Sequence, residues 1–323
     1  MRIELPNSAR LQNFEGFLRK YSPTEGDPDL VVKMHEKWIA VHPAALAMAA
    51  CLGEQAKQRG IKTTGAVPPI RPVRYLMRMG LFDHLDLKPT LGITEHEEAG
   101  RFVPLTNIRT SKGLSEAIAN LIPLLHAPPS VADPIKYVFS EMVRNVLEHS
   151  GSSVGAFVCA QYYKGSNTIA VGIADGGIGV LNSMQRSHAV TTPAEAIMRA
   201  LRPGVSGATN RIGGNERNAG AGLFFTKSIA ALSRRFFVIY SGDAAFKLLR
   251  TKEEVAAQLN ADATADKHRL RSGLPHWQGT VVGIDMSVEE GVEFAELLAR
   301  IREAYQIDVK KSKKEYFKQI RFS

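Results

Sequence analysis

Two apolar runs that lead into a group of glycines constrain the fold of this chain most. Residues 156–163 and 168–174 are apolar or alternate in polarity, and the turn sequence Lys-Gly-Ser-Asn joins them, which is typical of two paired strands. The second run continues into Asp175-Gly-Gly177-Ile-Gly179. Glycines at a strand end permit a positive φ or the close approach of a ligand. The pattern therefore predicts a ligand-binding edge that carries a carboxylate.

A helix with a row of polar residues precedes these strands. Residues 134–148 have helical periodicity, and Glu141, Asn145 and His149 recur every four residues, so they share one helix face. The solvent-exposed face of a simple amphipathic helix gives the same spacing. The row is thus compatible with a functional polar site or with a solvent-exposed helix face.

A further glycine-rich sequence opens a later helix. Asn218-Ala-Gly220-Ala-Gly222-Leu223 stands where a loop enters the helix that the apolar pattern predicts over 223–233. Free backbone N–H groups and the helix dipole favour phosphate oxygens at such a position. Taken alone the signal is weak, because glycines before a helix are also ordinary turn residues.

In type and order these motifs resemble the ATP-binding domain of the GHKL family. Gyrase-like ATPases, MutL-like proteins and histidine kinases share its Bergerat fold. The resemblance covers residues 100–290, and it includes a long connection over 180–219, interpreted as a lid, and a late strand that begins with Gly279-Thr280. It implies an α+β domain, a two-layer Bergerat-fold α/β sandwich whose mixed, mostly antiparallel sheet has helices on one face.

The resemblance also implies the cofactors, ATP and Mg²⁺, and a role for each matched residue. Asn145 is expected to hold Mg²⁺ at the phosphates, Asp175 to bind the adenine amine, and the Thr280 hydroxyl to support adenine. The remaining cofactor-binding residues by this resemblance are His149, Gly177, Gly179, Asn218, Gly220, Gly222 and Leu223.

Glu141 is the catalytic candidate. By the same resemblance, GHKL ATPases use a glutamate here to activate water, and anti-sigma serine kinases carry one in a similar helix. A carboxylate beside Mg²⁺-bound phosphate can accept a proton from water or from a serine hydroxyl. An ion pair with Arg144 is the structural alternative.

The sequence pattern of residues 1–95 predicts a small α/β domain. Strands are expected over 30–40 and 61–67, and helices over 44–59 and 73–79. This order resembles a STAS domain, the fold of anti-sigma-factor antagonists. Signalling STAS domains carry a phosphorylatable serine where this chain reads His-Pro-Ala-Ala from residue 42, so the domain lacks the phosphoacceptor and is either a docking module or a packing extension.

Composition is that of an ordinary globular protein. Of the 323 residues, 44% are hydrophobic and 23% charged, which excludes a disordered or fibrous chain and leaves room for two domains. We expect a cytoplasmic protein with no membrane segment, because no apolar run reaches the ~18 residues of a span. Cys51 and Cys159 lie in apolar segments and are expected to be reduced core residues.

A helix is expected over 292–305, followed by a basic tail that supplies much of the net charge of +9. Residues 291–323 therefore form the last segment, either a solvated tail or a contact for nucleic acid.

Three functions fit these motifs. The first is an ATP-binding regulatory protein with slow Mg²⁺-dependent hydrolysis, in which lid closure links the nucleotide to a protein partner or a homodimer. The second is a serine/threonine or histidine protein kinase of the anti-sigma-factor-kinase type. The third is a nucleotide sensor without catalysis.

Overall fold

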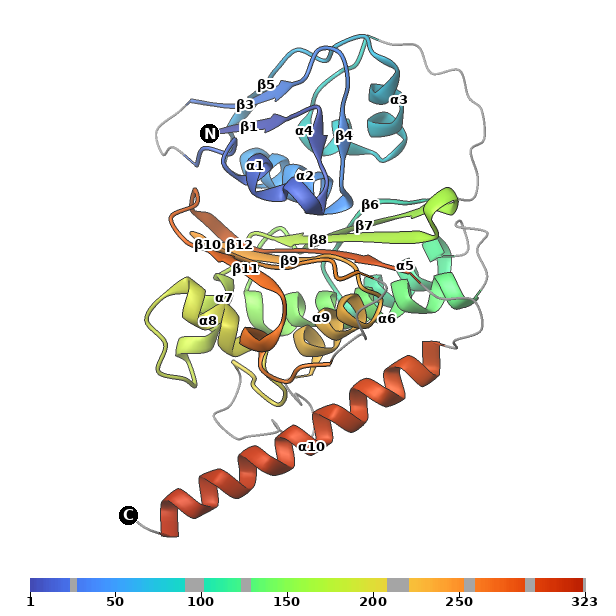
Figure 1. Cartoon of the computed structure of the whole chain (residues 1–323). Helices are drawn as coiled ribbons and strands as arrows, with labels where there is room; N and C mark the ends of the chain where they lie inside the picture. Colours follow the sequence, from blue (N-terminus) through green and yellow to red (C-terminus); the bar gives the residue numbers. More distant parts are fainter. Residues whose placement is uncertain are drawn as a thin grey trace.

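A seven-stranded antiparallel sheet forms the centre of the molecule (Figure 1). The computed structural model describes residues 1–23, 28–90, 102–122, 129–207, 221–252, 259–287 and 294–321. In spatial order the strands of the sheet are β11 His268–Arg271, β10 Ala244–Leu248, β9 Phe237–Gly242, β12 Trp277–Met286, β8 Thr168–Asp175, β7 Ala156–Tyr163 and β6 Phe102–Ile108. Helices accompany this antiparallel sheet, so the α+β class predicted from the sequence is confirmed.

Helices α5, α6 and α9 cover one face of the sheet (Figure 1). They span Ser111–Leu121, Pro129–Asn145 and Gly222–Leu232, and the shorter α7 and α8 span Gly179–Gln185 and Pro193–Ala200. Helix α6 is buried because its apolar residues recur at helical spacing. These residues, each at most 2% exposed, are Ile135, Val138, Phe139, Met142 and Val143.

The opposite face of the sheet is covered by α2, Pro43–Gln58, which belongs to the N-terminal part of the chain. Gly172 of β8 and Gly283 of β12 are paired in register, and the start of α2 lies directly on them. A Cβ added at Gly172 would collide with the Ala44 backbone, and one at Gly283 would lie 3.0 Å from the Ala44 Cβ. The sandwich predicted with helices on one face therefore has a third layer.

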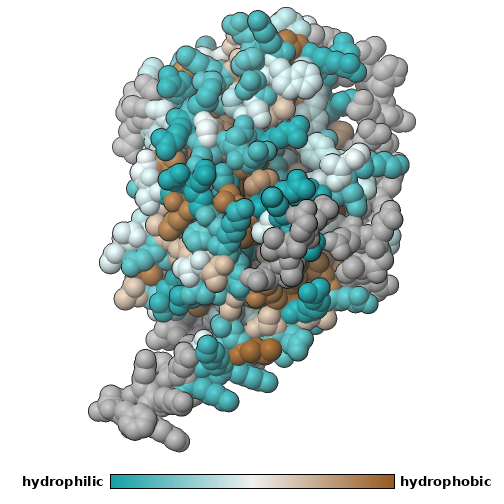
Figure 2. Space-filling view, in the orientation of Figure 1, coloured by the Kyte–Doolittle hydropathy of each residue, from teal (hydrophilic) through white to brown (hydrophobic). Residues whose placement is uncertain are grey.

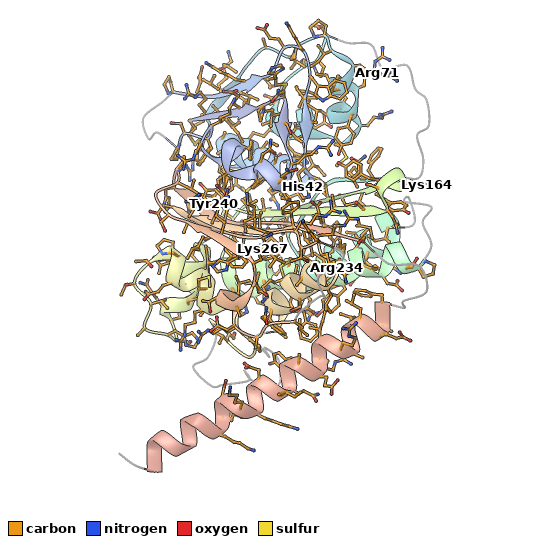
Figure 3. The ribbon with its side chains drawn as sticks, viewed as in Figure 1. His42, Arg71, Lys164, Arg234, Tyr240 and Lys267 are labelled. Atoms are coloured by element: carbon orange, nitrogen blue, oxygen red, sulfur yellow. The ribbon has the colours of Figure 1, made fainter. Side chains whose placement is uncertain are left out.

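His42 joins α2 to the sheet at the boundary between the two parts of the molecule (Figure 3). As N-cap residue, its Nδ1 accepts from the Ala44 N–H at 3.0 Å, so the proton of a neutral ring lies on Nε2. That nitrogen then donates to Asp285 Oδ1 of β12 at 3.2 Å. The two parts also share one hydrophobic cluster, which contains Leu46 of α2 and Phe157 of β7.

The N-terminal part forms a small parallel sheet with its own helices. Strands β1 Arg2–Leu5, β3 Asp29–Met34 and β5 Lys62–Thr64 pair in parallel, and β2 Ser8–Ala9 pairs with β4 Ala40–Val41. Helices α1, α3 and α4 span Phe14–Leu18, Arg71–Arg78 and Leu81–Leu85. The strand region predicted over 30–40 is thus two strands, and the predicted helix over 44–59 is α2.

Two segments contain more helix than the sequence pattern predicted. The lid predicted over 180–219 includes α7 and α8, and its residues 208–219 lie outside the described residues. The helix predicted over 292–305 continues through the basic tail: α10 spans Phe294–Arg321 and carries its C-terminal end away from the body (Figure 1). Its first half packs against α6 and α9, where Tyr305 meets the rings of Phe224 and Phe225.

Within the described residues, no helix combines the length and the apolar character that crossing a membrane requires. The face of the molecule in Figure 2 is mostly hydrophilic, with hydrophobic residues scattered or in small groups. Cys51 and Cys159 are buried and free, as predicted. Burial raises the pKa of both thiols, so neither is a reactive thiolate at neutral pH.

Candidate functional site

A cavity of about 400 Å³ lies between α6, α9 and the Asp175 end of the sheet. Its lining includes eight of the residues singled out in the sequence: Glu141, Asn145, His149, Asp175, Gly179, Gly222, Leu223 and Thr280. Gly177 lies beside the cavity without lining it, and Asn218 and Gly220 lie outside the described residues. Residues from four distant segments of the chain therefore meet at one place.

Asp175 ends β8 with its carboxylate buried at 2% exposure. Its Oδ1 accepts from the Gly177 N–H at 2.7 Å, and it pairs with Thr280 across the neighbouring strand β12. Burial raises the pKa of Asp175 to about 7, although the backbone N–H groups of Gly177 and Thr280 act to lower it. The cavity thus presents an oriented acceptor whose charge changes near neutral pH.

The glycines that follow Asp175 are needed for close packing. A Cβ at Gly177 would collide with the Ser150 carbonyl, and Gly179 has a φ of +75° beside Ser241. The Ser241 hydroxyl donates to the Gly279 carbonyl at 2.6 Å and accepts from the Val180 N–H, in the first turn of α7, at 2.9 Å. The strand-end glycines therefore hold the turn against its neighbours, as close approach requires.

The polar row of α6 continues into a π-helical turn, Val146–Ser150. Glu141 and Asn145 lie on the α-helical part and His149 on the π turn, yet all three line the cavity. The Ser150 carbonyl accepts from the Ile178 N–H at 2.8 Å, which ties the end of this helix to the turn after β8. Such π turns are frequent at functional sites.

Gly222 starts α9 against these side chains. A Cβ at Gly222 would lie 3.0 Å from Glu141 Oε2 and 3.3 Å from the Asn145 amide nitrogen, so the missing side chain leaves room for them. The N-cap, Ala221, makes no side-chain capping hydrogen bond. Ala221, Gly222 and Leu223 line the cavity, so the N-terminal end of α9, with its free backbone N–H groups and the positive end of the helix dipole, lies at it.

Glu141 takes part in the ion pair that the sequence offered as an alternative to catalysis. Its Oε1 is 3.4 Å from Arg144 Nη1, and Arg144 is half exposed, so the pair contributes little stability. Burial raises the pKa of Glu141, while Arg144 lowers it and Glu148 raises it. A carboxylate with a raised pKa is a stronger base than an exposed one.

Several lining residues carried no recognisable signal in the sequence. Arg302 reaches the cavity from α10, and Tyr137 reaches it from α6, one turn before Glu141. Burial raises the pKa of Tyr137 above the usual range, so its hydroxyl stays protonated. Arg302 is one of many basic residues in the last helix, and only the fold singles it out.

The described residues contain no group of three or more His, Cys, Asp or Glu side chains that could hold a metal ion by themselves. A cation here would need a ligand's own oxygens beside Asn145 and Glu141, as Mg²⁺ commonly has at phosphate sites.

No family model matches the chain, and no curated protein matches it.

Proposed function

We propose that this chain binds Mg²⁺-ATP in the 400 Å³ cavity and hydrolyses it slowly, as a regulatory protein of the GHKL type. The convergence of Glu141, Asn145, Asp175 and Thr280 on one cavity at the start of α9 carries the proposal. The volume lies within the range of about 300–1,000 Å³ usual for small-molecule pockets.

Asp175 is the adenine-recognising residue in this proposal. Its carboxylate is buried and held by the N–H groups of Gly177 and Thr280, and its remaining oxygen lone pairs can accept from the exocyclic amine of adenine. Thr280 stands opposite Asp175 in the strand register and can add a hydroxyl to the same base, directly or through water. A guanine base has an oxygen at that position and would face the carboxylate with an acceptor, which disfavours it.

The start of α9 and the polar row of α6 form the phosphate end. The N–H groups of the first turn of α9 favour phosphate oxygens, and Gly222 lets them approach. Asn145 beside Gly222 can offer an oxygen to Mg²⁺, which prefers oxygen ligands and retains several waters. The bound ion would supply charge neutralisation at the phosphates, and Arg302 of α10 can add a second positive charge.

Glu141 is the proposed general base. It lines the cavity beside Asn145, and its raised pKa suits a group that must accept a proton from an attacking water. Its ion pair with Arg144 keeps the side chain on this helix face. Removing this base alone is expected to lower hydrolysis by roughly 10²–10⁴-fold while nucleotide binding persists.

The regulatory part of the proposal rests on the segments around the cavity. Ala200 lines it from the end of α8, Val205 and Ser206 from the segment that follows, and Arg302 from α10. A bound nucleotide would therefore contact residues of 180–207 and of the last helix together. A protein partner or a second copy of the chain that reads these segments would sense the nucleotide state.

The test is an assay with Mg²⁺ and γ-labelled ATP, with and without cell extract, that follows free phosphate and labelled protein. We expect free phosphate, lost in Glu141→Gln with binding retained and lost in Asp175→Asn with binding weakened. Glu116→Gln is the matched control, since Glu116 is exposed on α5 and does not line the cavity.

Each other outcome identifies a different function. Label on a second protein would favour the kinase, with Glu141 as base towards a hydroxyl. Saturable binding without release or transfer of phosphate would favour the sensor. Absence of saturable ATP binding would refute the proposal.

A further inference from the structure

A second, larger cavity of about 770 Å³ lies where the N-terminal part meets the sheet. It is bounded by α3, by the segment around β4 and by the ends of β7, β8 and β12. Thr168 and Asp285 line it, whereas Asp175 and Thr280 of the same two strands line the candidate ATP site. The two cavities therefore lie at opposite ends of β8 and β12.

Arginine dominates the lining of this arginine cavity. The six arginines come from separate parts of the chain: Arg10, Arg71, Arg74, Arg78, Arg235 and Arg250. Asp285 is the one carboxylate among the described lining residues, and His42 already contacts it at 3.2 Å. Figure 3 shows Arg71 on the N-terminal part and His42 at the boundary below it. The cavity thus has a strong excess of positive charge.

Most of these arginines have no anionic partner among the residues that the structure describes. Arg10, Arg71, Arg74, Arg235 and Arg250 make no ion pair with any residue that the structure describes. Arg235 meets neutral groups only among those residues, the Ser287 hydroxyl and the Ser166 carbonyl. Like charges gathered at one place repel each other, and an anion that enters relieves this repulsion. Guanidinium groups bind phosphate with paired hydrogen bonds, so phosphate is the anion that they fit best.

Exposed aromatic rings stand in the same cavity. Trp38 is 58% exposed and Tyr163 is 38% exposed, and both are among its lining residues. Tyr75 also lines it, and its buried hydroxyl has no hydrogen-bond partner among the described residues. Aromatic faces stack on nucleobases, and a buried hydroxyl without a partner favours a ligand that supplies one. These features favour a ligand in which a planar, polar ring is joined to phosphate groups.

We propose that the arginine cavity is a second nucleotide site, which binds a free nucleotide with two or more phosphates. The arginines hold the phosphates, while Trp38 or Tyr163 stacks on the base. The volume suits one small molecule, and the lining is drawn from both parts of the chain around it, so a free nucleotide fits better than a nucleic acid strand. This inference does not depend on ATP binding at the first site.

The test is calorimetric titration of Asp175→Asn, in which ATP binding at the candidate ATP site is weakened, with ATP, GTP, inorganic tripolyphosphate and a ten-base oligothymidylate. We expect one saturable nucleotide site whose dissociation constant rises at least tenfold in Arg71→Ala/Arg74→Ala, because each lost charged hydrogen bond weakens binding. Both arginines are exposed, so the fold should persist, which circular dichroism checks. Arg300→Ala, an exposed arginine of α10 outside both cavities, should bind unchanged.

Fluorescence gives a second readout. Trp38 is exposed, whereas the other tryptophan, Trp277, is 1% exposed. A base that stacks on Trp38 should therefore quench the tryptophan fluorescence of the protein. The Trp38→Phe variant should not show this quenching. The proposal is overturned if no nucleotide binds saturably, or if the Arg71/Arg74 variant binds as tightly as its parent. Tripolyphosphate that binds as tightly as the nucleotides would overturn the base-stacking role. Tighter binding of the oligonucleotide would assign the cavity to single-stranded nucleic acid instead.

Discussion

Replacing Asp175 by asparagine should change how the stability of the protein depends on pH. The carboxyl is 2% exposed, and burial raises its pKa from an ordinary 3.8 to about 7 in the folded chain. Asparagine keeps an oxygen that can accept from the Gly177 N–H, but it cannot ionise. The variant therefore removes one titration and leaves the rest of the protein unchanged.

The sign follows from which state binds the proton more tightly. Between the two pKa values the folded chain holds a proton that the unfolded chain has released, so the wild type loses stability as pH rises from about 4 to 7. The difference of about three pKa units corresponds to about 4 kcal/mol in total. Most of this, about 3 kcal/mol, should appear between pH 5 and pH 8.

Urea unfolding of both proteins at several pH values from 5 to 8 measures this, with the fluorescence of buried Trp277 as signal. The free energy of unfolding of Asp175→Asn should rise relative to the wild type by about 3 kcal/mol over that range. A constant offset between the two proteins is irrelevant, since only the pH-dependent part reports on Asp175. Parallel curves across the range would refute the reasoning that the carboxyl is protonated when buried.

Three further changes test how the fold is held. Gly279→Ala should lower the free energy of unfolding by roughly 2–4 kcal/mol, because φ is +113° and the new Cβ would collide with the Asp175 carbonyl. Gly273→Ala is the control: at φ +71° in open space, it should lower the same free energy by about 1 kcal/mol in the urea assay. Lys227→Met should lower it by roughly 3–5 kcal/mol by leaving Asp266 buried without its ion pair, and Asp266→Leu added to it should restore most of the loss. His42→Ala removes the N-cap of α2 and its hydrogen bond to the sheet, so thermal unfolding should report a loss of about 1–2 kcal/mol, and an unchanged midpoint would contradict that role.

Periodicity predicted the elements that bury a regular face. Helices α2 and α6 and the strands β7 and β8 have long apolar patterns, and each appears within a few residues of its predicted bounds. Strand β11, with the sequence HRLR, is short and charged, and β6 contains Pro104, so neither gave such a pattern. The sequence predicted the last helix only as far as residue 305, because the lysines that follow hide the helical repeat that continues through α10.

The residues of the two cavities also differ in whether the sequence alone could predict them. Motifs local in sequence, such as the row from Glu141 and the glycines after Asp175, predicted eight of the residues that line the first cavity. Arg302 could not be predicted, since its role depends on where α10 crosses the molecule. The arginine cavity draws Arg10, Arg71 and Arg235 from distant segments, so no spacing in the sequence reveals it.

The length of α10 would turn a small tilt at the first cavity into a larger displacement at its far end. Arg302 lines that cavity, and the helix continues for 19 residues to Arg321, counted as 321 minus 302, which is about 28 Å at 1.5 Å per residue. A rigid rod of this length acts as a lever whose far end moves about 0.5 Å for each degree of tilt at the pivot. A tilt of ten degrees would therefore sweep the lysine-rich end through about 5 Å, roughly the pitch of one helical turn.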